Sequence, residues 1–227
     1  MGARSAGETV VVVTGGDPVA PGDLPAGIEG ATVVAADSGV DRAHELGLTV
    51  DVVVGDLDSV TSAGLSTATQ AGAEVQQHPE AKDATDLELA LAAALALAPR
   101  RLVVIGGHGG RLDHLLANAL LLASDALAGV EVVAQMGAAR VTVVREAAEL
   151  TGARGGHLTL LPVGGPALGI TTDGLLYPLR DEDLAPGSTR GVSNELLGPV
   201  AHVRLREGTL LAVQPGTTGA HHQKVTP

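Results

Sequence analysis

The chain has 227 residues with a formal net charge of −12, and 45% of its residues are hydrophobic. The negative charge argues against a nucleic-acid binder, because such proteins need a basic surface that neutralises phosphates. The sequence has no cysteine, which excludes disulfides, thiolate metal sites and cysteine nucleophiles. It shows neither an apolar run of membrane-spanning length nor a secretory signal, so we expect no membrane partner and a cytoplasmic location.

In the first half of the chain, short Val-rich runs alternate with longer runs rich in Ala and Leu. Unbroken β-branched runs are typical of strands buried on both faces of a parallel sheet, and the longer runs predict helices that cover it. This alternation indicates an α/β domain with a mostly parallel sheet. The expected elements in chain order are strands 9–13 and 32–36, helix 39–46, strand 50–54, helices 62–71 and 85–98, strand 102–105, helix 112–128 and strand 130–134.

From about Arg140 onward the sequence changes in texture, and glycine or proline recurs every few residues. Short strand-like runs at 158–161, 200–205 and 209–213 predict a smaller antiparallel β-domain. We therefore expect an α/β domain over residues 1–138, a β-domain over 139–215 and a flexible tail over 216–227.

Polar and glycine residues follow several of the predicted strands, where ligands bind in open α/β sheets. Asp37 follows the second strand, and Asp56-Leu57-Asp58 follows the third. Alternate residues of an extended segment point the same way, so Asp56 and Asp58 can share a hard cation such as Mg²⁺. The alternative is a solvated turn in which Asp58 or Ser59 caps the next helix.

The segment from Lys82 to Glu88 opens the clearest predicted helix. Thr85 and Glu88 have the spacing of a capping box, and Asp86 is a first-turn carboxylate favoured by the helix dipole. Lys82 is one of two lysines in a chain that otherwise uses arginine, which makes it a candidate phosphate contact. The alternative is that this segment does no more than start a helix.

A glycine-rich stretch from Gly106 to His114 lies between a predicted strand and a predicted helix. Glycines let backbone N–H groups approach phosphates, and Arg111 can clamp one. The stretch is neither a Walker loop nor a dinucleotide fingerprint. A loop with a surface Arg111–Asp113 pair is the structural alternative. A zinc site at His108 and His114 is disfavoured, because no third local ligand accompanies them.

These motifs and their order resemble the thiamine pyrophosphokinase family over about residues 10–213. The resemblance implies an α/β domain followed by a β-sandwich or roll. It also implies a homodimer with active sites shared between subunits, and the use of ATP, Mg²⁺ and thiamine. The matching segments are Ala36–Gly39, Gly55–Ser59, Lys82–Asp86, Gly106–His114 with Asn118, Thr172–Tyr177 and Gly191–Glu195.

The resemblance also implies roles for individual residues. Asp56, Asp58 and Asp86 would form the Mg²⁺ site with Asp37 close by, and Asp113 or Asp86 would accept the hydroxyl proton. Ser193 and Asn194 would contact thiamine from the other subunit. The catalytic set is therefore Asp56, Asp58, Asp86 and Asp113, and the nucleotide contacts are Asp37, Lys82, Thr85, Gly107, Arg111 and His114, with Asp113 beside them.

The absence of Trp and Phe departs from family members that stack thiamine on a tryptophan. Aliphatic residues or Tyr177 would have to flank the thiamine rings instead. One alternative function is a diphosphokinase acting on another hydroxymethyl substrate, such as a hydroxymethyl-dihydropterin. Another is a non-catalytic sensor of a nucleotide or of thiamine diphosphate, which would not need the Asp56/Asp58 pair.

Overall fold

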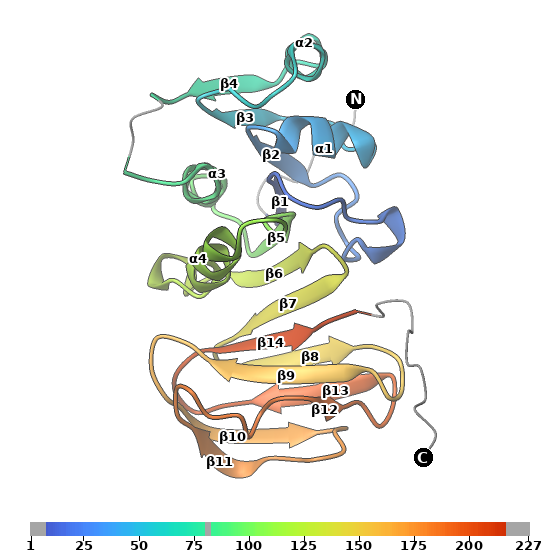
Figure 1. The fold of residues 1–227 in the computed structure, drawn as a ribbon, viewed down its shortest axis with the longest axis vertical. Helices are drawn as coiled ribbons and strands as arrows, with labels where there is room; N and C mark the ends of the chain where they lie inside the picture. The colour runs from blue at the N-terminus through green and yellow to red at the C-terminus, as the bar shows by residue number, and fades with distance from the viewer. Residues whose placement is uncertain (1–7, 80–82, 217–227) are drawn as a thin grey trace. The chain divides into compact units, whose positions relative to one another are not determined.

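The computed structural model describes residues 8–79 and 83–216, and the chain divides into two compact units (Figure 1). The first unit comprises Met1–Gly137 and Val141–Val143, and the second comprises Ala138–Arg140 and Val144–Pro227. Strand β7 (Ala139–Val144) is the segment in which the chain passes from one to the other. The expected tail and Lys82 lie outside the described residues.

Parallel strands form the sheet of the first unit, in the order β6-β5-β1-β2-β3-β4. The chain winds outward from β1 through β2 and β3 to β4, and then returns to place β5 on the other side of β1. The winding direction therefore switches between β1 and β5, where doubly wound sheets open a ligand crevice. The strands are β1 (Thr9–Val13), β2 (Thr32–Ala36), β3 (Val52–Gly55), β4 (Glu74–Gln77), β5 (Arg101–Ile105) and β6 (Glu131–Met136).

Helices cover both faces of this sheet, which makes the first unit a three-layer structure (Figure 1). Helix α1 (Gly39–Glu45) and α2 (Ser62–Gln70) share a buried cluster with Val11, Val33 and Val53, whose side chains point to one face. Helix α3 (Asp86–Leu95) packs against β1, β2 and β3, and α4 (Leu112–Leu122) lies on the same side as α3. Short 3₁₀ turns span Pro21–Asp23 (η1) and Asp125–Leu127 (η2).

The second unit is an antiparallel β-sandwich. One sheet has the order β11-β10-β13-β8, and facing strands pair as β12-β9-β14. Aliphatic side chains from both layers, among them Leu158, Ile170, Val203 and Leu210, form one buried core. The strands are β8 (Ala147–Thr151), β9 (His157–Pro162), β10 (Ala167–Asp173), β11 (Arg180–Leu184), β12 (Asn194–Glu195), β13 (Val200–Arg204) and β14 (Leu210–Gln214).

The predicted fold class is confirmed. The strands predicted at 9–13 and 32–36 have the observed bounds, whereas the helix predicted over 112–128 ends at Leu122 and continues only as the turn η2. Strand β4 was not predicted, because its sequence Glu-Val-Gln-Gln is largely exposed and lacks an apolar run. Within the described residues, no helix is long and apolar enough to cross a membrane.

Candidate functional site

Three carboxylates meet at the carboxyl edge of the first unit's sheet. Asp37 follows β2, and Asp56 and Asp58 follow β3. One carboxylate oxygen from each lies within 4.8 Å of the other two. Asp37 is buried, Asp56 is half-buried and Asp58 is exposed, so the cluster opens from the sheet edge toward solvent. A set of carboxylate oxygens this close fits a hard divalent cation.

The backbone that gathers this cluster differs from the extended segment expected from sequence. Leu57 has a φ of +69°, so the chain turns between Asp56 and Asp58. The Leu57 N–H donates to Asp37 Oδ1 at 3.1 Å, and a Cβ at Gly55 would collide with the Asp37 carboxylate. Thr61, rather than Asp58 or Ser59, caps α2 by accepting from the Gly64 N–H at 3.0 Å. Capping therefore does not account for the two aspartates.

Asp37 has an unusual protonation behaviour. Burial raises the pKa of its carboxyl to about 6, against the opposing hydrogen bond from Leu57, and the neighbouring carboxyls of Asp86 and Asp56 add to the rise. The rise means that burial first, and the neighbouring carboxyls in addition, disfavour the charged form of Asp37. A bound divalent ion would relieve the repulsion between the carboxylates.

The N-terminus of α3 brings further polar groups to this edge. Thr85 is the N-cap residue, and its hydroxyl accepts from the Glu88 N–H at 3.2 Å, as half of the predicted capping box requires. Asp86 opens the helix and adjoins Asp37. The segment that contains Lys82 lies outside the described residues, so the position of this lysine is not assigned.

The glycine-rich loop between β5 and α4 completes a pocket of about 330 Å³. Arg111 binds Asp113 in a forked pair, with Nη2 donating at 2.6 Å and Nε at 3.2 Å. This pairing lowers the pKa of Asp113 to about 2 and raises the pKa of Arg111. An exposed Asp113 with so low a pKa is a weak proton acceptor while it stays paired.

The pocket unites most of the residues that the sequence singled out. Its lining includes Asp37, Thr85, Asp86, Gly107, Arg111 and His114. Asp56 and Asp58 belong to the site because they cluster with Asp37, and Asp113 belongs to it because it accepts hydrogen bonds from Arg111. Ser38, Ser59, His108 and Asn118 belong to the segments that match the family, but sequence analysis assigned them no individual role, and the Thr14–Gly16 loop was noted only as part of the polar edge of the sheet. These residues also line the pocket.

Ser193 and Asn194 lie in the second unit. Asn194 is buried, its Oδ1 accepts from the Tyr177 and Glu195 N–H groups, and its Nδ2 donates to the Tyr177 carbonyl at 2.7 Å. Asn194 thereby fixes the backbone of Tyr177. Ser193 is exposed with a φ of +58°. Exposed apolar side chains surround the pair, and we call Leu176, Tyr177, Val192 and Leu197 the Tyr177 patch.

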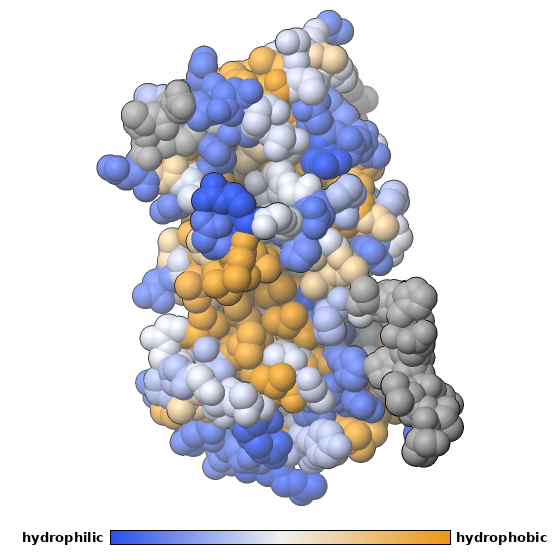
Figure 2. All heavy atoms as spheres, in the orientation of Figure 1, coloured by the Kyte–Doolittle hydropathy of each residue, from blue (hydrophilic) through white to orange (hydrophobic). Residues whose placement is uncertain are grey.

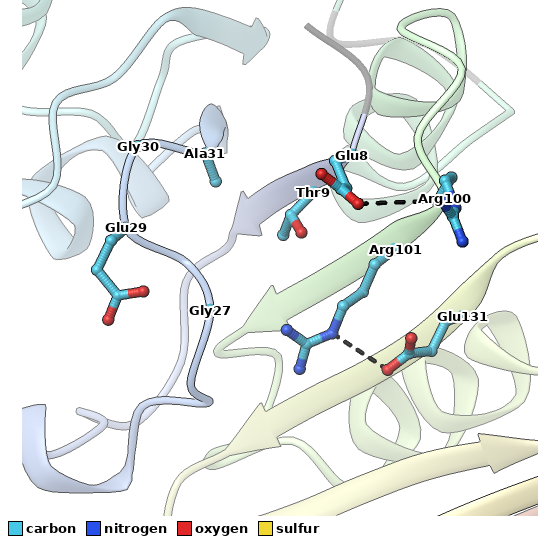
Figure 3. A pocket seen from close by; sticks show the side chains of 9 residues that line it. All are labelled: Glu8, Thr9, Gly27, Glu29, Gly30, Ala31, Arg100, Arg101 and Glu131. Atoms are coloured by element: carbon cyan, nitrogen blue, oxygen red, sulfur yellow. Dashed lines mark ion pairs between the residues drawn. The ribbon is translucent and has the colours of Figure 1, made fainter. Parts of the chain in front are cut away.

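A second pocket, of about 430 Å³, lies at the amino ends of β1, β5 and β6 (Figure 3). Its charged groups bind one another: Arg101 lies 3.2 Å from Glu131 and donates to the Ala26 carbonyl, and Arg100 lies 3.9 Å from Glu8. This pocket contains neither the carboxylate cluster nor the glycine-rich loop. The pocket at the carboxyl edge is therefore the candidate active site.

Comparison with known families agrees with this choice. A model described as "Thiamin pyrophosphokinase, catalytic domain" matches residues 29–134, which include the carboxylate cluster and the glycine-rich loop. A second model, "Thiamin pyrophosphokinase, vitamin B1 binding domain", matches residues 142–210, which include the Tyr177 patch. Together they span both units.

Individual relatives cover nearly the whole chain. Thiamine pyrophosphokinase of Bacillus subtilis (strain 168) is 25% identical over 210 residues, which cover 91% of this chain and 98% of the relative. The crystal structure of thiamin pyrophosphokinase from Geobacillus thermodenitrificans is 26% identical, with a TM-score of 0.76, and the match covers 93% of this chain and 99% of that one. Yeast thiamin pyrophosphokinase shares the fold at 13% identity, with a TM-score of 0.69.

Proposed function

The chain belongs to the thiamine pyrophosphokinase family, and on that premise we propose that it transfers the pyrophosphoryl group of ATP to the hydroxyl of thiamine. The hydroxyl oxygen of thiamine attacks the β-phosphorus of ATP. The bond from this phosphorus to the oxygen bridging it to the α-phosphate breaks, and AMP leaves. The hydroxyl proton passes to an acceptor, and thiamine diphosphate is released.

The observation that carries this proposal is the carboxylate cluster beside a glycine-lined pocket. ATP is a polyanion and the chain has a net charge of −12, so direct contact between carboxylates and phosphates would be repulsive. Asp56, Asp58 and Asp86, with Asp37 close by, offer the oxygen ligands that suit Mg²⁺. When bound there, Mg²⁺ would neutralise phosphate charge and hold the phosphates near the acceptor.

The residues around the pocket supply positioning. The N-terminus of α3 at Thr85 and the backbone of the loop after Gly107, at His108–Gly110, offer N–H groups suited to phosphate oxygens. Arg111 and His114 add donors at the mouth, and Lys82 is a further phosphate contact proposed from its sequence position. Pyrophosphoryl transfer asks little covalent chemistry of the protein, so positioning and charge neutralisation do most of the work.

Two carboxylates were candidates for the proton acceptor. Asp113 is held ionised by its forked pair with Arg111, and its pKa of about 2 gives it little affinity for a proton. Asp86 lines the pocket beside Asp37. We therefore assign proton acceptance to Asp86 rather than Asp113.

The second unit is proposed to bind the thiamine rings. The Tyr177 patch offers one aromatic and three aliphatic side chains, which are 42–57% exposed. In a chain without Trp or Phe, such groups can flank a heterocycle. Ser193 adds an exposed hydroxyl, and Asn194 holds the Tyr177 backbone in place.

We further propose that the active form is a homodimer in which one subunit's second unit serves the other subunit's nucleotide site. The supporting observation is a row of leucines on α4, which we call the α4 stripe. Leu112, Leu116 and Leu120 recur every four residues and are 67%, 56% and 59% exposed. Apolar side chains gather over this helix in Figure 2. Exposed apolar rows of this kind mark interaction surfaces.

The reaction is tested by mixing purified protein with ATP, MgCl₂ and thiamine and separating the products by chromatography. We expect AMP and thiamine diphosphate in equal amounts. Asp56→Ala should lower turnover by more than about a hundredfold, because it removes a cation ligand, whereas Asp113→Ala should lower it about tenfold. Equal losses in the two variants would contradict this ranking.

A parallel reaction contains hydroxymethyl-dihydropterin in place of thiamine. If AMP forms only with the pterin, the proposed pyrophosphoryl transfer stands, but the acceptor is the pterin rather than thiamine. If ATP is consumed in neither reaction although the protein binds the nucleotide, the proposed enzymatic activity is refuted and the alternative of a non-catalytic sensor is favoured.

A further inference from the structure

Two loops meet where the sheet changes its winding direction. One follows β1 and contains Thr14–Asp17, and the other follows β5 and contains Gly106–Gly110. The strands that carry them are direct neighbours in the sheet. Ligand crevices open at such a switch point, and both loops contribute to the lining of the candidate pocket. The role of their contact rests on the proposed function for the identity of the nucleotide.

The backbones of the two loops are interlocked. The Gly107 N–H donates to the Gly15 carbonyl at 2.8 Å, and the Asp17 N–H donates to the His108 carbonyl at 2.5 Å. A Cβ at Gly109 would lie 2.6 Å from Asp17 Oδ1, and a Cβ at Gly16 would collide with the His108 carbonyl. The position of one loop therefore determines the position of the other.

His108 is the side chain that connects this contact to the pocket. His108 lines the pocket, and its side chain is 41% exposed. Its Nδ1 atom, in contrast, is buried and forms no hydrogen bond of ordinary geometry in the described structure, and it lies 3.3 Å from Asp17 Oδ2. Asp17 itself is not among the residues that line the pocket. The lining of the pocket therefore includes the histidine but not its carboxylate neighbour.

This arrangement orients the imidazole. Nδ1 faces the Asp17 carboxylate, so Nε2, on the opposite edge of the ring, is directed away from it. Only the imidazolium form donates from both nitrogens, so a ring that binds a carboxylate through Nδ1 and a phosphate through Nε2 carries both protons, and the two anions favour that form. Arg111, the nearest strong cation along the chain, is already bound by Asp113. His108 would then offer the phosphates a positive charge, in contrast to the negatively charged carboxylate cluster.

We propose that His108 contacts the triphosphate of the bound nucleotide through Nε2, and that Asp17 is a positioning residue that acts through His108. The pair shares no residue with the carboxylate cluster proposed to hold Mg²⁺ or with the Tyr177 patch proposed to bind thiamine. Loss of either side chain should therefore weaken nucleotide binding while thiamine binding remains unchanged.

The test measures binding of MgATP by titration calorimetry in the absence of thiamine. His108→Ala should weaken the affinity about tenfold, as expected for a lost hydrogen bond to a charged group. His108→Gln keeps a donor but no charge and should fall between His108→Ala and the parent. The KM for MgATP should rise in parallel, with the KM for thiamine unchanged. His202→Ala, an exposed histidine of the second unit, is the matched control.

A double-mutant cycle tests the role assigned to Asp17. Asp17→Asn should weaken MgATP binding severalfold in the parent chain but should have no further effect in the His108→Ala background, because Asp17 acts through His108. Asp125→Asn, an exposed aspartate of η2, is its control. Thermal melting shows that each variant folds, and His108→Gln replaces His108→Ala if the latter does not.

The outcomes separate this inference from the proposed function. Parent-like affinity in the His108 variants, or an undiminished effect of Asp17→Asn in the His108→Ala background, would overturn the inference even if thiamine diphosphate is formed. A protein that shows the expected binding pattern but makes no thiamine diphosphate would refute the proposed function and leave the inference standing. Failure of the parent protein to bind MgATP would overturn the inference as well.

Discussion

Asp37 destabilises the protein when no cation is bound. Its side chain is 6% exposed, it adopts a φ of +45°, and it lies beside the carboxyls of Asp86 and Asp56. Its pKa of about 6 in the folded protein exceeds the ordinary value of 3.8. The folded state therefore holds this proton more tightly than the unfolded state does. The stability that the proton contributes is complete below pH 4 and is lost as the pH rises toward 6.

We expect Asp37→Asn to stabilise the metal-free protein at pH 8 by about 1–2 kcal/mol, which is less than the unscreened value of a two-unit pKa shift. At pH 3 the difference should nearly vanish, because Asp37 is then mostly protonated in both states. Asparagine keeps an oxygen that accepts from the Leu57 N–H. Urea denaturation at both pH values, with a chelator present, measures the effect.

The stabilities of the parent protein and of the Asp37→Asn variant are also compared with MgCl₂ added. If the cluster binds a cation, added Mg²⁺ should stabilise the parent protein more than the variant and should remove the variant's advantage at pH 8. An Asp37→Asn protein that is less stable than its parent at pH 8 without metal would show that the carboxylate is not under repulsion.

The residues of the site differ in how far sequence could predict them. Asp56 and Asp58 stand out locally, because two carboxylates follow a Val-rich strand. Their meeting with Asp37 depends on the pairing of β2 with β3, and the sequence predicted a common sheet edge for these residues but not the strand order. His108 was weighed only as a zinc ligand, since its partner Asp17 lies 91 positions away in the chain. Such a pair becomes visible only when β1 and β5 are known to be neighbours.

At the scale of elements, Thr61 joins two helices through one side chain. Its hydroxyl accepts from the Gly64 N–H and donates to Asp41 Oδ1 at 2.5 Å, while its own N–H donates to Asp41 Oδ2 at 2.9 Å. Asp41 lies in the first turn of α1 and Thr61 caps α2. The start of α2 is thereby tied to α1 on one face of the sheet.

Thr61→Ala should lower the free energy of unfolding by about 1–2 kcal/mol, because it removes the helix cap and one hydrogen bond to a carboxylate. Thr61→Ser should recover most of the loss. Thr67→Ala is the control in the same helix, since the Thr67 hydroxyl bonds only the Ala63 carbonyl among the described residues, and alanine favours helix. Chemical denaturation measures all three. Equal losses at positions 61 and 67 would contradict the bridging role.

The strands with long Val-rich runs were predicted from sequence, whereas β4, β7, β8, β10, β11 and β12 were not. The central strands bury nearly every side chain, so their Val-rich runs are unambiguous. Strand β4 at the sheet edge and β11, with the sequence Arg-Asp-Glu-Asp-Leu, are mostly polar because one or both faces meet solvent. Pairing with a neighbouring strand, rather than an intrinsic pattern, makes them strands.

At the scale of the whole molecule, charge and apolar surface are distributed unevenly. The chain is strongly acidic, yet three leucines of α4 stand exposed in one row. The sequence predicted the helix but not the exposure of this row, since the same leucine spacing is typical of a helix facing its own core. Where the apolar face of a helix is left uncovered, a second copy of the chain is the partner that the proposed shared active site requires.

Leu116→Glu, at the centre of the α4 stripe, should convert the proposed dimer to a monomer, because association would bury one unpaired carboxylate from each copy. Light scattering after gel filtration should show the mass of two chains for the parent protein and of one for the variant. Val75→Glu, on the edge strand β4, adds the same charge at an exposed apolar position and should stay dimeric.

The monomer should still bind MgATP but form thiamine diphosphate slowly, because the Tyr177 patch would come from the partner. A Leu116→Glu protein that stays dimeric would remove α4 from the interface. A fully active monomer would show that each chain supplies its own thiamine contacts.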